Sequence, residues 1–308
     1  MKILITDKVD SLLIHELEKN KLSYQFMLNE TKEEILNQIN QFNGIIVRNR
    51  LKLDASFLKK CKHLKFIARY GSGMENIDLT KAKELDITCF NSASGNCNSV
   101  GEHAIGMLLC LLHNIKKSSI QVDNGFWNRE LNKGIELCKK KVGIIGYGHT
   151  GQNFAKKLIG FNCQILAYDK YKSRYNSPNI KEVNLEQIYQ QSDIISFHVP
   201  LNKETFHLFN QQFINNMHKP FYLINTSRGG VVSNNDLIRG LKSEKILGAC
   251  LDVIENEVSS FRKIKLDSNF DFLANCDNVI MTPHIAGLSN EASENLSLIL
   301  IEKILELI

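Results

Sequence analysis

Proline and long apolar runs are scarce in this sequence. Its 308 residues include 4 Pro and 18 Gly with no triplet period, which excludes a collagen-like chain. Hydrophobic residues make up 43%, enough apolar mass to exclude a disordered chain. The longest apolar stretch, residues 104–112, is far shorter than the roughly 20 residues of a membrane helix. We therefore expect a folded protein with no membrane partner.

Concentrated positive charge and paired cysteines are also missing. The net charge is +5, and the longest basic run is Lys139-Lys140-Lys141, so a nucleic-acid partner is not expected. None of the eight Cys falls in a C-x-x-C spacing, which argues against a metal site. Residues 1–7 are too short for a signal peptide and predict a first strand instead. Reduced thiols without an export signal favour the cytoplasm.

Short apolar runs alternate with helical periodicity along most of the chain. The length suggests about two domains. The runs are continuous rather than alternating, which is typical of parallel strands covered on both faces, so we predict a doubly wound α/β fold. The predicted strands are 3–6, 44–48, 65–69, 142–146, 164–168, 194–198, 221–225, 248–251 and 279–282.

Four helices have local signals. Thr31 with Glu34 predicts a capping box. Residues 234–236 are candidate caps for a helix to about Ser243. Residues 99–116 and 289–308 predict two strongly apolar helices. These two suit a domain junction or a subunit interface, and equally two ordinary core helices.

A glycine-rich loop follows the strand predicted at 142–146. Gly146, Gly148 and Gly151 fit the pattern G-x-G-x-x-G, with His149 and Thr150 inside it, and a helix is predicted over 152–160. The first glycine permits a tight turn, the second admits a pyrophosphate, and the third allows close helix–strand packing. The helix start adds N–H groups and a positive dipole end. The pattern predicts a dinucleotide site.

An acid completes this pattern. Asp169 ends the next predicted strand, 18 residues after Gly151, close to the position of the ribose-binding acid. A carboxylate there accepts hydrogen bonds from the ribose hydroxyls and repels a 2′-phosphate, so the predicted cofactor is NAD rather than NADP. A second loop, Gly71-Ser72-Gly73, lacks the third glycine and is predicted only to offer backbone N–H groups to an anion.

Three later strands are followed by polar residues. Arg228 follows the strand at 221–225, Glu257 the strand at 248–251, and His284 the strand at 279–282. Ligands bind at the carboxyl ends of strands in such sheets, so these residues are candidates for a site. Each also has an ordinary alternative, as a surface ion pair, a loop acid or a helix-entry residue.

Four segments carry a resemblance to a known family. Residues 146–151, 225–232, 248–253 and 282–287, in this order and spacing, resemble the D-isomer-specific 2-hydroxyacid dehydrogenases. The resemblance runs from about residue 3 to the C-terminus. Residues 47–50, 68–73 and 96–103 are most similar to the phosphoglycerate-oxidising branch, in a short form without a C-terminal regulatory domain. Allosteric inhibition through such a domain is therefore not expected.

The resemblance implies two doubly wound parallel-sheet domains, Rossmann- and flavodoxin-like. A discontinuous substrate-binding domain would comprise residues 1–95 and 285–308, with an NAD-binding domain, residues 96–284, inserted in it. It also implies a homodimer, in which the helices at 99–116 and 289–308 serve as domain crossovers.

The resemblance also implies a reaction, reversible hydride transfer between the substrate C2 and the nicotinamide. Arg228 would bind the substrate carboxylate and the C2 oxygen. His284 would take the hydroxyl proton during oxidation, and Glu257 would orient His284. Asp252 would lie at the nicotinamide end of the cofactor. The implied cofactor-binding residues are Gly146, Gly148, His149, Thr150, Gly151, Asp169, His198, Val199, Pro200, Thr226, Ser227, Asp252 and Gly287.

A phosphorylated substrate carries about two extra negative charges, so its site needs more than one arginine. The resemblance also implies a role for Arg129. It matches a basic residue that, in the phosphoglycerate-oxidising branch of the family, reaches across the dimer to the substrate. The implied substrate-binding residues are Arg48, Asn49, Arg50, Arg69, Gly71, Ser72, Gly73 and Arg129.

Two alternatives remain open from the sequence. A glyoxylate or hydroxypyruvate reductase would need no phosphate-binding arginines. A non-catalytic NAD-sensing protein, similar to corepressors of this fold, would bind the cofactor without turnover. The sequence alone does not identify the 2-hydroxy acid, the physiological direction of the reaction or its kinetic constants. It also does not show whether the dimer assembles further. Val258 stands where many family members have Pro, which leaves that loop's rigidity open.

Overall fold

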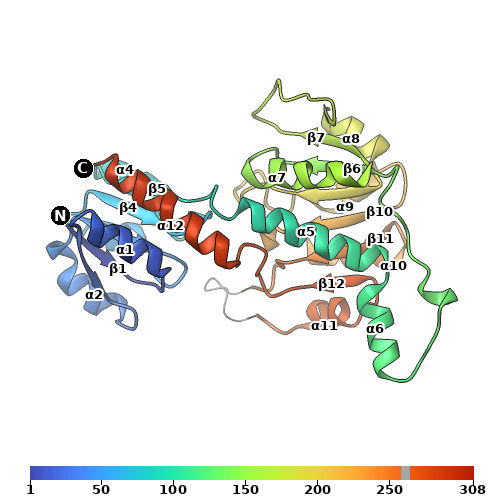
Figure 1. The fold of residues 1–308 in the computed structure, drawn as a ribbon, viewed down its shortest axis with the longest axis horizontal. Coiled ribbons are helices and arrows are strands. Elements are labelled where there is room, and N and C mark those ends of the chain that lie inside the picture. The colour runs from blue at the N-terminus through green and yellow to red at the C-terminus, as the bar shows by residue number, and fades with distance from the viewer. Residues whose placement is uncertain (258–263) are drawn as a thin grey trace. The chain divides into compact units, whose positions relative to one another are not determined.

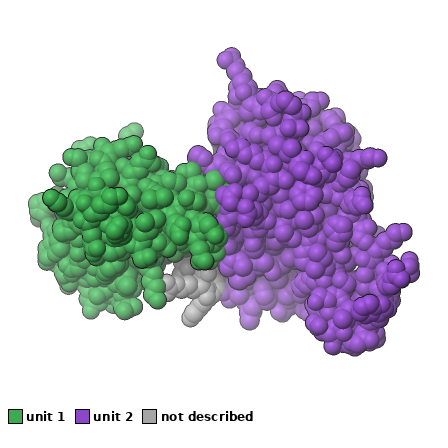
Figure 2. Space-filling view, viewed as in Figure 1, with its two compact units in different colours: residues 1–97, 288–308 green, residues 98–287 purple. Residues whose placement is uncertain are grey.

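The chain folds into two compact units, one inserted into the other. The computed structural model describes residues 1–257 and 264–308. Unit 1 consists of residues 1–97 and 288–308, and unit 2 of residues 98–287 (Figure 2). Both hold parallel sheets with helices between the strands, as the sequence predicts (Figure 1). None of the described helices has the length and apolar character needed to cross a membrane.

Unit 1 is built on a five-stranded parallel sheet in the order β2-β1-β3-β4-β5. Its last helix comes from the end of the chain and packs against α1 (Figure 1). Leu296, Leu300 and Ile304 of that helix join one core cluster with Ile3 and Leu13. The elements are β1 Lys2–Ile5, α1 Ser11–Lys19, β2 Ser23–Phe26, α2 Lys32–Gln38, η1 Ile39–Gln41, β3 Gly44–Val47, α3 Ala55–Leu58, β4 Phe66–Arg69, α4 Leu79–Glu84, β5 Thr88–Asn91 and α12 Asn290–Leu305.

The described part of unit 2 holds a seven-stranded parallel sheet in the order β12-β11-β10-β9-β6-β7-β8. The strand order reverses between β6 and β9, which makes their carboxyl ends the switch point of the sheet. The elements are α5 Cys97–Leu112, α6 Ile115–Asp123, η2 Glu130–Asn132, β6 Lys141–Ile145, α7 His149–Leu158, η3 Ile159–Phe161, β7 Gln164–Tyr168, β8 Ile180–Glu182, α8 Leu185–Gln191, β9 Ile194–Phe197, α9 Gln211–Asn216, β10 Phe221–Asn225, η4 Gly229–Val231, α10 Asn234–Lys242, β11 Ile246–Leu251, α11 Ser268–Ala274 and β12 Val279–Met281.

The unit 2 sheet is buried on both faces. Ile145 and Leu223 belong to one core cluster, while their neighbours Ile144 and Ile224 belong to another. Successive strand residues point to opposite faces, so each of these strands needs apolar residues at every position. Burying one such side chain contributes about 1.5–3 kcal/mol. This explains why the strands appear in the sequence as continuous apolar runs.

The carboxyl ends of the unit 2 strands are aligned at one edge of the sheet. Cα pairing runs from Met281 to Leu251, Asn225, Phe197, Ile145 and Tyr168 across six strands. The residues that follow this row are brought close together although they are far apart in sequence. The row therefore positions the loops that begin at residues 146, 169, 198, 226, 252 and 282.

Two of the helix predictions need correction. The single helix predicted over 99–116 is two helices, because Asn114 takes a left-handed conformation with φ of 52° between α5 and α6. Asparagine tolerates this conformation better than most residues. The cap of α10 is Ser233, whose side chain accepts from the Asp236 N–H, rather than a residue of 234–236. The Thr31–Glu34 capping box is confirmed.

Candidate active site

The three glycines of the loop after β6 have different surroundings. Gly146 has a φ of 93°, and a Cβ there would lie 2.5 Å from the His198 carbonyl oxygen. A Cβ on Gly151 would lie 2.1 Å from the Gly146 carbonyl oxygen. Gly148 is the N-cap of α7 without a side-chain cap, and a Cβ there would meet no atom within 4 Å. The outer glycines pack against backbone, whereas the middle one leaves the helix start open.

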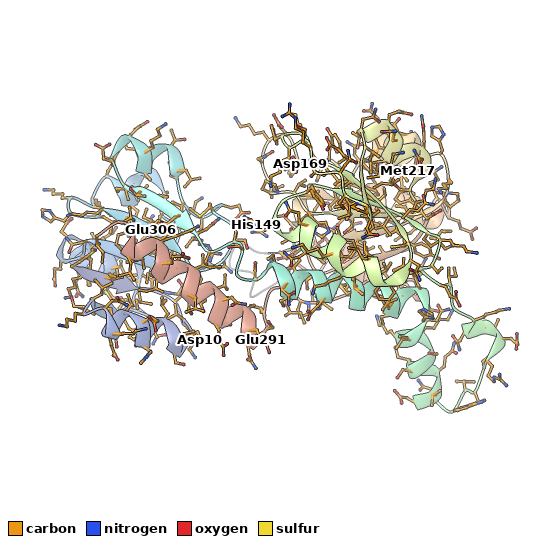
Figure 3. All side chains as sticks on the ribbon, turned by 45° about the horizontal axis from the view of Figure 1, so that its top comes forward. Asp10, His149, Asp169, Met217, Glu291 and Glu306 are labelled. Carbon is orange, nitrogen blue, oxygen red and sulfur yellow. The ribbon has the colours of Figure 1, made fainter. Side chains whose placement is uncertain are left out.

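Asp169 ties the glycine loop to the end of β7. One carboxylate oxygen accepts a hydrogen bond from the Tyr147 N–H at 2.7 Å. The other accepts from the N–H groups of Tyr171 at 2.9 Å and Lys172 at 3.0 Å. Figure 3 labels Asp169 together with His149, the first residue of α7. The carboxylate is thereby fixed beside the loop where the ribose of a dinucleotide is expected.

Two buried polar atoms lie just after β9 and β10. His198 Nδ1 and Thr226 Oγ1 have no hydrogen-bond partner among the described residues. His198 Nε2 lies 2.8 Å from the Ser196 Oγ, and burial lowers the pKa of His198 to about 3, so the ring is neutral. Buried polar atoms in proteins normally have a partner. Their position beside the switch point suits a polar ligand. Val199 and Pro200, also expected at the cofactor, directly follow His198 in the loop after β9.

The loop after β10 is organised by the side chain of Asn225. Its Nδ2 donates to the Arg228 carbonyl at 3.0 Å, and its Oδ1 accepts from the Ser227 N–H and Oγ. Arg228 Nη1 donates to the Ser227 carbonyl at 2.7 Å. A Cβ on Gly229 would lie 2.0 Å from the Ile254 carbonyl oxygen. The loop after β10, which carries Arg228, therefore lies directly against the loop that follows β11.

Glu257 and His284 form a carboxylate–imidazole pair. Glu257 Oε2 lies 2.6 Å from His284 Nδ1, and their side chains are 15% and 24% exposed. Glu257 Oε1 accepts from the Ile254 N–H at 2.9 Å. His284 has a φ of 55°, a backbone conformation that costs energy for residues other than glycine. Its N–H donates to the Asp252 carbonyl at 2.9 Å, which helps to hold it there.

Asp252 supports the loop that carries His284. The side chain is almost completely buried, and its two oxygens accept from Thr282 Oγ1 at 2.6 Å and from the N–H groups of Ile285 and Ala286 at 2.8 and 2.9 Å. His103 Nε2, from α5, lies 3.0 Å from the same Thr282 hydroxyl. Asp252 thus fixes the strained backbone on both sides of His284.

Together these residues form a set suited to proton exchange. An imidazole with one nitrogen bound to a carboxylate can exchange a proton at its other nitrogen with a bound hydroxyl. A guanidinium at the end of the neighbouring strand can bind a carboxylate through paired hydrogen bonds. The glycine loop lies at the same edge of the sheet, beyond β9.

Comparison with known proteins agrees with this arrangement. Residues 105–286 match the family model described as "D-isomer specific 2-hydroxyacid dehydrogenase, NAD binding domain". The chain belongs to the D-isomer specific 2-hydroxyacid dehydrogenases.

Three known proteins illustrate how similar this chain is to its relatives. A D-3-phosphoglycerate dehydrogenase of Archaeoglobus fulgidus is 33% identical over the whole chain, which spans 57% of that protein's length. A hydroxypyruvate reductase of Thermotoga maritima is 36% identical over 89% of the chain and 87% of its own length. The solved D-lactate dehydrogenase of Aquifex aeolicus, complexed with NAD and lactic acid, is 28% identical, with a TM-score of 0.85 over 99% of this chain and 95% of its own.

NAD is the cofactor of this dehydrogenase family, and the residues present fit it. The open N-terminus of α7 at Gly148 suits the pyrophosphate. The fixed carboxylate of Asp169 suits the ribose hydroxyls. The unpartnered atoms of His198 and Thr226 suit further polar groups of the dinucleotide. Gly287 ends unit 2, directly after the loop that Asp252 supports.

Three of the arginines expected at the substrate, Arg48, Arg50 and Arg69, lie in unit 1 and have different environments. Arg69 Nη2 donates to the Asn49 Oδ1, which brings these two together. The Arg48 guanidinium lies over the Tyr70 ring at 5.3 Å. The Arg50 guanidinium instead donates to the carbonyls of Thr6, Met27 and Glu30. These three bonds give Arg50 a structural role.

Two of the remaining expected substrate-binding residues already have hydrogen-bond partners within unit 1. The Gly71 N–H donates to Ser92 Oγ, and the Ser72 hydroxyl donates to Asn96 Oδ1. Gly73 is part of the same loop. Arg129 is exposed and precedes η2, in the segment that follows α6. Val258 lies outside the described residues.

Three supporting residues were not anticipated from the sequence: Asp7, His103 and Asn225. Buried Asp7 follows β1 and accepts from the N–H groups of Arg48 and Arg50. Asp7 and Asn225 stand at the ends of strands, a signal available in the sequence. His103 has no such signal, because only the fold brings α5 to Thr282.

Proposed function

We propose that this protein oxidises D-3-phosphoglycerate to 3-phosphohydroxypyruvate with NAD. The observation that carries the chemistry is the Glu257–His284 pair, 2.6 Å apart, beside the loop that bears Arg228. NAD, when bound, accepts the hydride from C2 of the substrate or returns it. This reaction is the first step of serine biosynthesis. We also propose that the protein is located in the cytoplasm.

His284 handles the proton in this mechanism. During oxidation the C2–H bond breaks as a hydride leaves, the C2 hydroxyl becomes a carbonyl, and His284 Nε2 takes the hydroxyl proton. During reduction the same nitrogen returns the proton. Glu257 binds Nδ1, fixes the orientation of the ring and balances the positive charge of its protonated form. Arg228 binds the substrate carboxylate and aligns C2.

The choice of a phosphorylated substrate rests on unit 1. Arg48 and the Asn49–Arg69 pair supply cationic and polar groups in one loop region, with the Gly71–Gly73 segment beside Arg69. We expect these groups to bind the acidic groups of the substrate. The resemblance of the chain to D-3-phosphoglycerate dehydrogenases supports this choice.

A hydroxypyruvate reductase is the second candidate. Arg50 is held by backbone carbonyls, which leaves fewer arginines for a phosphate. The 36% identical relative, covered over 87% of its length, is a hydroxypyruvate reductase. This function would use the same Glu257, His284 and Arg228.

The deciding experiment follows NADH absorbance with the purified chain and NAD at alkaline pH, with hydrazine trapping the oxo acid. The substrates are 3-phosphoglycerate, glycerate and lactate in parallel. Turnover restricted to 3-phosphoglycerate supports the proposal. Turnover with unphosphorylated acids alone supports the reductase, and NAD binding without turnover of any acid supports the NAD-sensing alternative.

Two arginine variants separate mechanism from specificity. Arg228→Lys keeps a charge without the planar fork and should lower kcat/KM for every acid by at least about 10-fold. Arg48→Ala should raise KM for the phosphorylated acid alone. Lys62→Ala, an exposed cation of unit 1, serves as the control. Normal turnover of Arg228→Lys would contradict the mechanism.

We also propose that the protein is a homodimer. The segment from α6 to η2 exposes several large apolar side chains that the described residues of unit 2 leave uncovered. A second copy of this chain is the occupant that the family resemblance favours. The exposed residues are Ile115, Ile120, Val122, Phe126, Trp127 and Leu131.

A further inference from the structure

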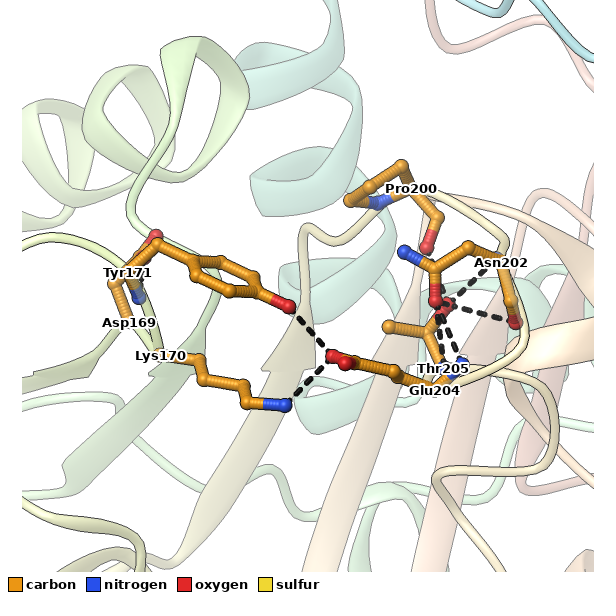
Figure 4. A network of polar contacts seen from close by, with 7 residues as sticks. All are labelled: Asp169, Lys170, Tyr171, Pro200, Asn202, Glu204 and Thr205. Carbon is orange, nitrogen blue, oxygen red and sulfur yellow. Dashed lines mark hydrogen bonds and ion pairs between the residues drawn. The ribbon is translucent and has the colours of Figure 1, made fainter. Parts of the chain in front are cut away.

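Glu204 lies across the cofactor-binding end of unit 2 from Asp169. It belongs to the loop after β9, whereas Asp169 directly follows β7, and β6 with its glycine loop lies between these strands. Its carboxylate Oε2 accepts from Lys170 Nζ at 2.7 Å and from the Tyr171 hydroxyl at 2.5 Å (Figure 4). The contact therefore joins the two loops that flank the glycine loop.

The loop that carries Glu204 is itself well ordered by hydrogen bonds. Asn202 Oδ1 accepts from the N–H groups of Glu204 and Thr205 at 2.8 and 3.0 Å. The Thr205 hydroxyl donates to the Pro200 carbonyl at 2.6 Å (Figure 4). Glu204 thus has a fixed backbone in the loop that begins with the expected cofactor-binding residues His198, Val199 and Pro200, even though its side chain is half exposed.

The charges in this contact have a direct bearing on the cofactor. In enzymes of this architecture that use NADP, an arginine near the ribose accommodates the 2′-phosphate. A lysine ammonium can bind phosphate as well. Lys170 follows Asp169 directly, and its ammonium is bound to Glu204. Their hydrogen bond raises the pKa of Lys170 and lowers that of Glu204, so both groups are charged at neutral pH.

We propose that Glu204 holds Lys170 away from the ribose 2′ position and so, together with Asp169, sets the preference of this protein for NAD over NADP. Glu204 binds the ammonium of Lys170, the residue directly after the ribose acid, whereas the ammonium of Lys172, two residues further, donates to the Tyr147 carbonyl. It also adds a second carboxylate near the position where a 2′-phosphate would bind. The proposal concerns the cofactor alone, so it stands or falls independently of the substrate.

The test measures equilibrium binding of NADH and NADPH to the full chain by cofactor fluorescence, without substrate. In Glu204→Gln, Kd for NADPH should fall by about 10-fold, because a released ammonium can bind the phosphate. Kd for NADH should stay within about 2-fold, which also shows that the variant is folded. The gained NADPH affinity should weaken as salt is added.

Three further variants identify the cause. Glu102→Gln breaks an exposed ion pair with Lys157 elsewhere on unit 2 and should leave both Kd values unchanged. Tyr171→Phe removes one hydrogen bond but keeps the Lys170–Glu204 pair, so it should not improve NADPH binding. The double variant Lys170→Gln with Glu204→Gln should lose the gain. An unchanged NADPH affinity in Glu204→Gln, or a gain that persists in the double variant, would overturn the proposal.

Discussion

At the scale of single residues, Glu257 has a separate partner for each of its carboxylate oxygens. Oε2 binds His284, and Oε1 accepts from the Ile254 N–H within the same loop. The carboxylate can therefore not rotate without losing a bond. Both carboxylate oxygens of Asp252 likewise accept hydrogen bonds, from N–H groups directly after His284. Two acids of the loop after β11 therefore orient this one histidine.

This arrangement predicts the effect of removing one charge. Glu257→Gln should keep the fold but lower kcat by about 10²–10⁴-fold, since the charge facing the protonated ring is lost. KM should change much less. Steady-state kinetics measure both, with Glu186→Gln, an exposed acid of α8, as the control. A kcat within a few-fold of the parent protein would refute the assigned role.

His198 gives a prediction about stability. In the native protein burial lowers its pKa to about 3, whereas in the unfolded chain the ring binds a proton near pH 6.5. The unfolded state therefore gains a proton first as the pH falls, and stability decreases below about pH 6.5. Between pH 7 and pH 5 this loss amounts to about 2 kcal/mol.

Urea unfolding at these two pH values tests it. His198→Gln should lose about 2 kcal/mol less than the parent protein over this interval, each compared with its own value at pH 7. The exposed His63→Gln variant should retain the full loss. Equal losses in His198→Gln and the parent protein would show that His198 is not the titrating group.

The contrast between Arg50 and His284 shows what can be predicted for a single residue. The position of His284 after a strand sufficed to predict where it lies. The partners of Arg50 are three carbonyls from two other loops, so only the folded chain shows that this arginine is structural.

At the scale of elements, the turn from β6 into α7 depends on two glycines for different reasons. Gly151 has no room for a Cβ, because the Gly146 carbonyl oxygen would be 2.1 Å away. Gly148 has room, but its open side is the helix start.

Alanine substitutions should separate the two reasons. Gly151→Ala should reduce both the unfolding free energy and NADH affinity, because backbone must move. Gly148→Ala should weaken NADH binding by at least about 10-fold with little change in stability, because its methyl group would project toward the pyrophosphate. Gly160→Ala, which also has open space, is the control. Thermal unfolding and NADH titration measure the two effects, and tight NADH binding by Gly148→Ala would place the phosphates elsewhere.

The strands divide into those the sequence predicts and those it does not. All nine predicted strands are present, since burial on both faces leaves a continuous apolar run. The three missed strands, β2, β5 and β8, lie at sheet edges. Edge strands are only partly covered, so Ser23–Phe26 and Thr88–Asn91 carry no such run.

At the scale of the whole molecule, the exposed apolar segment after α6 gives a prediction about assembly. Trp127 is 81% exposed and Leu131 is 71% exposed. If a second copy covers them, the double variant Trp127→Glu with Leu131→Glu should sediment as a monomer at concentrations where the parent protein is a dimer. Tyr171→Glu, also in an exposed position, should leave the dimer intact. A monomeric parent protein would refute the proposed homodimer.

The division of unit 1 into two segments has a consequence for biosynthesis. Its core cluster takes Leu296, Leu300 and Ile304 from α12, which is translated after all of unit 2. Domains tend to fold as they leave the ribosome, in the order of their synthesis. Here the unit that begins the chain has to wait for α12, so we expect unit 2 to be native on the ribosome while residues 1–97 still lack part of their core.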